Sequence, residues 1–151
     1  MDLKGRVLAR LAVGLIWLCV IAAGQNQERF TTRLSSVAMD LSMRDTITGS
    51  GSVTAVLTGT RLSINGSFAG LSSPATAARL HRGRLTGLRG VAVFDLHADR
   101  ATSGAITGSF ELTADQVASL RKGELYVQLH SEKAPDGNLW GWLLRQEGRT
   151  R

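Results

Sequence analysis

The chain has 151 residues and a formal net charge of +6, and charged side chains make up 20% of it. This length favours a single domain with a substantial buried core. The charge is too small to indicate nucleic-acid binding. The single cysteine, Cys19, lies near the N-terminus, which excludes a disulfide framework of the kind that small animal ectodomains use.

The first 24 residues are predicted to be a secretory signal peptide. Basic side chains precede an apolar run over residues 11–23, which is shorter than the roughly 20 residues that a membrane-spanning helix needs. We expect cleavage near Gly24 or Gln25, and hence a secreted or periplasmic protein that is not inserted in a membrane. The alternative is that this segment is kept as an uncleaved anchor.

The rest of the chain is expected to divide into a polar leader over 25–34, a domain over 35–145 and a tail over 146–151. Within the domain, short segments alternate apolar and polar side chains between clusters of Gly, Ser, Asn and Asp. This pattern indicates half-buried antiparallel strands. The first strand is expected to place four apolar side chains on one face: Val37, Met39, Leu41 and Met43.

The later strands follow at intervals along the chain. Two are expected within "GSVTAVLTG" and "RLSINGSFAG", joined by a hairpin turn at residues 58–60. The others are expected over 77–82, 90–97, 104–112, 124–130 and 138–144. A Pro-Asp-Gly turn at 135–137 would join the last two. About eight such strands predict an antiparallel sandwich or barrel.

One helix is predicted in "LTADQVASLRKG". Thr113 is expected as the N-cap residue and Gln116 as its capping-box partner, so that each side chain satisfies a free backbone N–H. Val117 and Leu120 supply a short apolar stripe, and Gly123 can adopt the left-handed conformation that ends a helix. We expect this helix to cover one end of the sheet structure.

Several stretches, taken in order, resemble the CHRD domain, a module named from chordin that is widespread in exported bacterial proteins. They are "GSVTAVLTGTRLSINGSFAGLSSPATAARLH", "GVAVFDL", "ITGSFELTADQVASLRKGELYVQLH" and "PDGNLWGWL". The resemblance runs from about Gly49 to Leu143. It implies an immunoglobulin-like or superoxide-dismutase-like β-sandwich without an established activity. The family's usual opening, with a Glu-Val-Pro-Pro run, is replaced here by "MDLSMRDTITGSGS".

The resemblance also raises the question of a metal site. Family members often carry His-x-His and a later single histidine on neighbouring strands, and three imidazoles would suit copper or zinc. Here Arg79 replaces the first histidine, while His81 and His130 keep the other two positions and His97 is additional. Since a guanidinium group binds no metal, we expect no cofactor and histidines that hydrogen-bond to the backbone. Copper or zinc held by His81, His130 and His97 is the alternative.

A second candidate site is the arginine-rich stretch "RLHRGRLTGLRG". Its four guanidinium groups are predicted to clamp phosphate, sulfate or carboxylate groups of a lipid headgroup, an acidic polysaccharide or an acidic protein. The four residues are Arg79, Arg82, Arg84 and Arg89. The competing interpretation is a solvated loop whose arginines add solubility.

A third candidate site follows from strand alternation. If Leu80, Leu129, Leu139 and Leu143 face the core, their neighbours on the same strands must face outward. This outward set is Trp140, Trp142, Tyr126, Gln128 and His130. Outward aromatic rings are expected to contact sugar rings or a protein partner, unless the leader or the tail covers them.

Reaction chemistry is not indicated by any motif in the chain. There is no nucleophile elbow, phosphate-binding glycine loop or Cys-x-x-Cys pair. We therefore expect an exported, non-catalytic binding or interaction module whose partner is an envelope or extracellular protein or polysaccharide. A metal-binding or redox protein and a self-associating scaffold are the alternatives.

Overall fold

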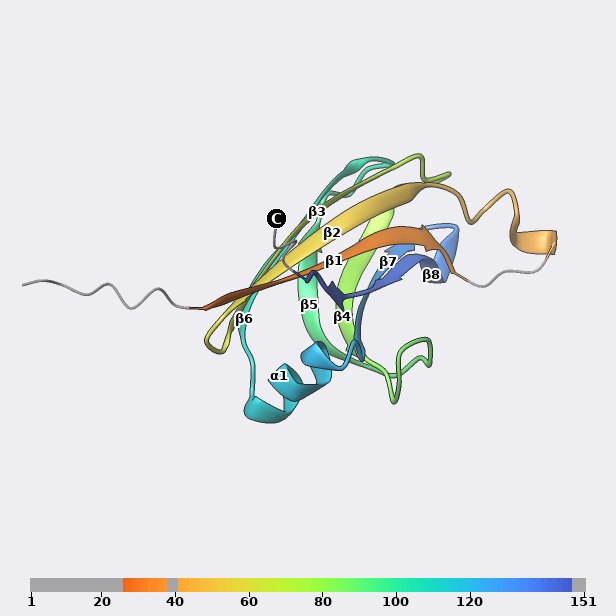
Figure 1. The fold of residues 1–151 in the computed structure, drawn as a ribbon. Helices are drawn as coiled ribbons and strands as arrows, with labels where there is room; N and C mark the ends of the chain where they lie inside the picture. The colour runs from red at the N-terminus through yellow and green to blue at the C-terminus, as the bar shows by residue number, and fades with distance from the viewer. Residues whose placement is uncertain (1–25, 38–40, 148–151) are drawn as a thin grey trace, which may run out of the picture.

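The structure is a computed structural model that describes residues 26–37 and 41–147. The predicted signal peptide and its cleavage site lie outside the described residues. Figure 1 shows the elements, which follow one another as β1 (Gln27–Ser36), a 3₁₀ turn (Leu41–Met43), β2 (Ser50–Thr58), β3 (Arg61–Ala69), β4 (Ala75–Arg82), β5 (Val91–Ala98), β6 (Gly104–Glu111), α1 (Ala114–Arg121), β7 (Leu125–Ser131), β8 (Ala134–Trp142) and β9 (Leu144–Arg145).

Eight of these strands form a closed antiparallel barrel. The strand order is β2-β3-β6-β5-β4-β7-β8-β1, and β1 returns to pair with β2. The short strand β9 pairs with β1 at Phe30 and Thr31 in the same register as β8, so it continues β8 along the same edge of β1. An all-β antiparallel fold with one short helix is therefore confirmed.

Because the ring of strands is closed, the fold is a barrel and not the expected immunoglobulin-like or superoxide-dismutase-like sandwich. Strand β1 pairs with β2 through residues 27–34 and then with β8 through Ser35 and Ser36. Strand β5 likewise pairs with β4 through residues 91–96 and then with β6 through His97 and Ala98. Because β1 and β5 each pair with strands of both sheets, the two sheets join and leave no open edge between them.

The first strand lies earlier in the chain than the sequence predicts. Residues 25–34, expected as a polar leader, contain most of β1, whose Phe30 and Leu34 are 0% and 2% exposed. Val37 follows that strand, Leu41–Met43 form a single 3₁₀ turn, and Met39 lies outside the described residues. Only two large apolar side chains occur in β1, so its alternation gave a weak signal among polar neighbours.

The barrel core confirms the alternation predicted for the later strands. Leu80, Leu129, Leu139 and Leu143 are all 0% exposed and belong to one hydrophobic cluster. Residues next to them on the same strands consequently face away from that core.

Both hairpins can be compared with their predicted turns. The β2–β3 turn falls at Gly59 and Thr60 as expected, and Gly59 has a φ of +64°. The β7–β8 turn falls at Glu132 and Lys133 instead of at Pro-Asp-Gly. Residues 135–137 lie inside β8, where the pairing register with β7 shifts.

Helix α1 forms as predicted and lies at one end of the barrel (Figure 1). Thr113 and Gln116 complete both hydrogen bonds of the capping box. Val117 and Leu120 join the barrel core, and Gly123 follows the helix with a φ of +73°. The helix thereby closes the core at this end.

Candidate functional site

The candidate site lies on the outer face of the wall formed by β4, β7 and β8. Tyr126, Gln128 and His130 point outward from β7, as predicted, yet they are only 1%, 3% and 8% exposed. A second packed layer must therefore cover the outside of this wall.

Aromatic rings form the first part of that layer. The ring of Tyr126 stacks on His81 at 4.9 Å between centroids and lies 4.4 Å from Trp142. Trp140 meets Tyr126 edge-on at 6.0 Å and Trp142 at 6.3 Å. We call these four residues the outer aromatic cluster. Both tryptophans are half-buried, so this outward aromatic surface is partly covered.

The loop between β4 and β5, residues 83–90, forms the second part. We call it the arginine loop. The Tyr126 hydroxyl accepts a hydrogen bond from the Gly90 N–H at 3.1 Å and donates to the Gly90 carbonyl at 3.3 Å. The Nδ1–H of His81 donates to the same carbonyl at 3.2 Å. Two members of the outer aromatic cluster thus hold the end of the loop.

Further contacts hold the start and the middle of the arginine loop. The Gly83 N–H donates to the Glu124 carbonyl at 2.8 Å, and Thr86 Oγ1 donates to the Gly123 carbonyl at 2.8 Å. Gly83 lies so close to Trp142 that an added β-carbon would be 2.6 Å from the indole ring. The Arg89 guanidinium lies 5.0 Å from the centroid of Trp140, within range of a cation–π interaction. The cover over the cluster is therefore this loop, whereas the sequence suggested the leader or the tail.

The four arginines predicted to form one clamp have different roles. Arg79 and Arg82 belong to β4 and are paired with Asp95 at 3.1 Å and with Asp115 at 2.5 Å. Only Arg84 and Arg89 lie on the loop, and both are exposed. The hydrogen bond between Arg82 and Asp115 raises the pKa of the guanidinium and lowers the pKa of the carboxyl group. Among the described residues, the arginines available to an anion here are thus Arg84 and Arg89.

The histidines are held individually. His130 Nδ1–H donates to the Pro135 carbonyl at 2.8 Å, next to the bond from Gln128 Nε2 to the Asp136 carbonyl. Burial is the main cause that lowers the pKa of His81. The Nε2 atoms of His81 and His130 are buried and have no hydrogen-bond partner.

His97 does not join the other two histidines. It lies on β5 where that strand pairs with β6, its side chain is 73% exposed, and Nε2 is 3.7 Å from Asp99. Within the part of the chain that the structure describes, no three His, Cys, Asp or Glu side chains are grouped to hold a metal ion.

Exposed apolar side chains occur on two separate segments. Across residues 26–37 and 41–147, six large apolar side chains are exposed, and five of them lie within residues 41–43 and 85–91. Leu85, Leu88 and Val91 are 61%, 52% and 72% exposed, and Leu41 and Met43 are 83% and 41% exposed. A cavity of about 230 Å³ lies between these segments, with Met43 and Arg89 among its lining residues.

The contacts of Gly83 and Gly90 were not anticipated from the sequence. Alternation placed His81 and Tyr126 on the outer face, but it gave no sign that a loop would fold back over them. The available signal was composition, since three glycines at 83, 87 and 90 allow the backbone to approach side chains closely.

The comparisons with known proteins give one match. A family model described as the CHRD domain matches residues 30–143. No curated protein and no solved structure matches the chain. No helix in the described ranges is both long and apolar enough to cross a membrane.

Proposed function

The chain belongs to the CHRD domain family, whose model covers most of its length, and from this premise we propose that it is an exported, non-catalytic binding module that holds its ligand on the arginine loop. The predicted signal peptide supports export to a secreted or periplasmic location. The arginine loop covers the outer aromatic cluster, so the loop and not the rings beneath it is the surface that a ligand would meet.

The single observation that carries this proposal is the burial of Tyr126 on the outside of the barrel. An outward tyrosine that is 1% exposed has a partner for its hydroxyl in Gly90 and partners for its ring in His81 and Trp142. These contacts fix the shape of a loop that would otherwise be free to vary. A loop held in one shape loses less conformational entropy when it binds, which favours affinity.

The ligand is expected to be anionic. Arg84 and Arg89 are exposed on the loop, and guanidinium groups suit phosphate, sulfate and carboxylate groups. The buried histidine nitrogens Nδ1 of His81 and His130 are already bound to backbone carbonyls, which is a structural role. In a non-catalytic module, this hydrogen bonding to the backbone is a sufficient role for both histidines.

Retention on immobilised dextran sulfate tests this proposal. The wild-type chain should elute at higher salt than Arg84→Gln, because one guanidinium contact is removed and the attraction is screened by salt. Arg33→Gln, which changes an exposed arginine on β1, is the matched control and should elute with the wild type. Equal elution of all three proteins would contradict a role of the loop in anion binding.

A second candidate function is copper or zinc binding through His81 and His130. The observation that favours it is that both rings donate Nδ1–H to a carbonyl and leave a buried, unpartnered Nε2. This is the tautomer and orientation that metal-bound histidines commonly have. Equimolar metal in protein purified without a histidine tag, lost in His81→Ala/His130→Ala, would support this candidate. Protein that takes up no copper or zinc would eliminate it.

A further inference from the structure

We propose that the partner of the arginine loop is the surface of an anionic phospholipid bilayer, with Leu85 and Leu88 entering the headgroup region. This inference rests on the proposed function and names the ligand class for the same surface. It concerns attachment to one face of a bilayer, with no segment of the barrel crossing it.

The first support is the pattern of side chains on the loop. In "RGRLTGLRGV" the exposed Leu85 and Leu88 are flanked by Arg84 and Arg89, so that apolar and cationic groups share one short tip. Single exposed leucines are common on protein surfaces and mean little. Several exposed apolar side chains next to basic ones are typical of surfaces that bind a bilayer. The apolar groups are buried among the lipid headgroups, and the basic groups contact the phosphates.

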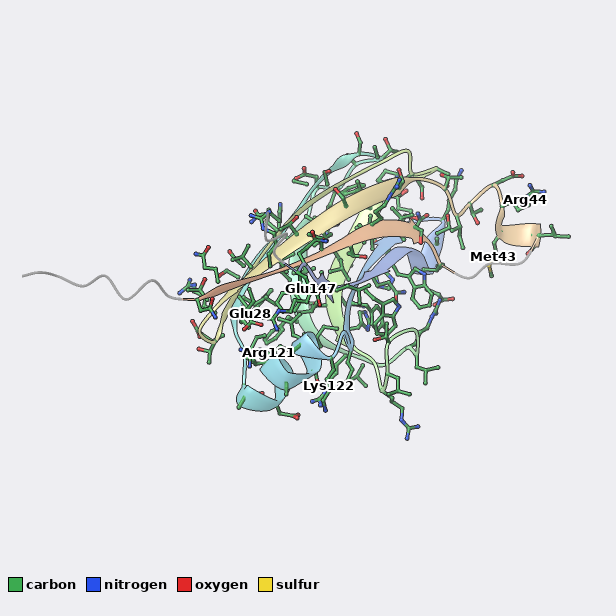
Figure 2. The ribbon with its side chains drawn as sticks, viewed as in Figure 1. Glu28, Met43, Arg44, Arg121, Lys122 and Glu147 are labelled. Carbon is green, nitrogen blue, oxygen red and sulfur yellow. The ribbon has the colours of Figure 1, made fainter. Side chains whose placement is uncertain are left out.

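The second support is a separate segment with the same chemistry. Leu41 and Met43 are exposed next to Arg44 in the segment between β1 and β2. Figure 2 shows that the side chains of Met43 and Arg44 lie at a tip that projects away from the barrel. Two apolar tips, each with arginine, would give the protein two points of attachment.

The third support is the cavity between the two tips. Met43 and Ile47 line it from one segment and Arg89 from the arginine loop. Lys133 and Asp136 line it from the β7–β8 hairpin, together with the apolar Ala134 and Pro135. The two cations Arg89 and Lys133 outnumber the one acidic lining residue, Asp136, so the lining favours a phosphate headgroup that is attached to acyl chains. Arg89 is already placed there by its contact with Trp140.

A bilayer fits these observations better than a soluble polymer. An acidic polysaccharide would use the arginines but would give no reason for the exposed leucines. An acidic protein would bury apolar groups in a broad complementary patch, whereas these groups lie on two separate tips. The arginine loop is pinned at Gly83, Thr86 and Gly90, so insertion of its tip needs little ordering.

Vesicle binding by the chain from Gln25 onward, which is the form that the predicted signal cleavage leaves, tests the inference. Residues 1–24 are left out of every protein compared, because their apolar run would bind vesicles by itself. Wild type should bind vesicles of mixed phosphatidylglycerol and phosphatidylcholine more tightly than pure phosphatidylcholine, and less tightly as salt rises. Leu85→Ser/Leu88→Ser should weaken this binding about tenfold, and Arg84→Gln about fivefold. The matched controls are Leu144→Ser, which alters the sixth exposed apolar side chain, and Arg100→Gln; neither should change it.

A local measurement completes the test. Amide hydrogen exchange at residues 84–91 should slow when anionic vesicles are added, and that at residues 61–69 should not. Binding that survives Leu85→Ser/Leu88→Ser, or no slowing at 84–91, would overturn the inference. If dextran sulfate retention still depends on Arg84 in that case, the proposed anion-binding function stands and only its bilayer partner is removed. If that retention is independent of Arg84, both fail.

Discussion

His81 contacts both the outer aromatic cluster and the arginine loop. Its ring stacks on Tyr126, its Nδ1–H holds Gly90, and its strand β4 leads directly into the arginine loop. Burial is the largest cause that lowers the pKa of its imidazole below the ordinary value of 6.5. The hydrogen bond to Gly90 opposes this shift, while the charges of His130, Arg79 and Arg89 add to it. His81 is therefore kept neutral at neutral pH.

This shift predicts how stability depends on pH. Because the folded-state pKa is lowered, the unfolded chain takes up a proton at His81 first as the pH falls. The contribution of His81 to the free energy of unfolding is therefore complete above pH 6.5 and is lost as the pH falls toward the folded-state pKa. Denaturant unfolding between neutral and mildly acidic pH measures this loss.

The matched variant for this prediction is His81→Asn. Asparagine keeps an N–H donor near the position of Nδ1 but does not titrate, so the decline below pH 6.5 should become shallower than in the wild type. The same decline in both proteins would contradict a lowered pKa at His81.

At the scale of elements, the arginine loop depends on close contact between its backbone and the rings beneath it. A β-carbon at Gly83 would meet the Leu88 carbonyl oxygen and would lie 2.6 Å from the Trp142 ring. Its neighbours cannot give way easily, because one is backbone and the other is an indole packed on Tyr126.

Gly83→Ala should accordingly lower the free energy of unfolding by about 1–3 kcal/mol, the usual cost of overpacking. It should also change the near-ultraviolet circular dichroism of the tryptophans. Gly59→Ala is the control, since nothing lies near its added β-carbon and only the positive φ of +64° causes strain. That variant should lose about 1 kcal/mol with an unchanged aromatic signal. A wild-type aromatic signal in Gly83→Ala would show that the loop does not pack on Trp142.

At the scale of the whole molecule, Glu28 links the first strand to the helix and to the last strand. Its carboxylate accepts from Arg121 of α1 at 2.5 Å and lies 3.5 Å from Arg145 of β9. Figure 2 places Glu28 and Arg121 close together at the end of the barrel where α1 lies. The Glu28 side chain is only 9% exposed, and the hydrogen bond from Arg121 is the main cause that lowers its pKa.

Glu28→Gln should reduce the free energy of unfolding by about 1–2 kcal/mol, because glutamine removes the charge that strengthens the hydrogen bonds from Arg121 to this shielded side chain. Glu111→Gln is the matched control. Arg61 is 3.8 Å from Glu111, both side chains are mostly exposed, and the hydrogen bond from Thr60 to Glu111 is also exposed, so this change should cost less than about 1 kcal/mol. Equal losses in urea unfolding would indicate that Glu28 is no more important than a surface pair.

The strands that carry the core could be predicted because their alternation is strong. Leu80, Leu129, Leu139 and Leu143 were placed inward from period two alone, and all four are fully buried. The helix could be predicted because Thr113 and Gln116 are a local signal that needs no distant contact. In β1 the alternation is carried by Phe30 and Leu34 alone, so that strand was missed.

The closure of the barrel and the cover over Tyr126 depend on contacts between distant residues. The period-two alternation is the same in a sandwich and in a barrel. The two folds differ here only because β1 and β5 each pair with strands of both sheets. Tyr126 and Gly90 are 36 residues apart, and their hydrogen bond depends on the path of the whole loop. Alternation gave the direction of the tyrosine but not what lies over it.

The measurement that tests the account most directly is amide hydrogen exchange in Tyr126→Phe. This change removes the hydroxyl that bonds both backbone groups of Gly90 and keeps the ring that packs on His81 and Trp142. The amides of Leu88 and Gly90 should exchange about tenfold faster or more, which is the effect of losing roughly 1.4 kcal/mol of local protection, while those of β7 and β8 keep their wild-type rates. Unchanged exchange at Leu88 and Gly90 would contradict the claim that the outer aromatic cluster holds the arginine loop in its binding shape.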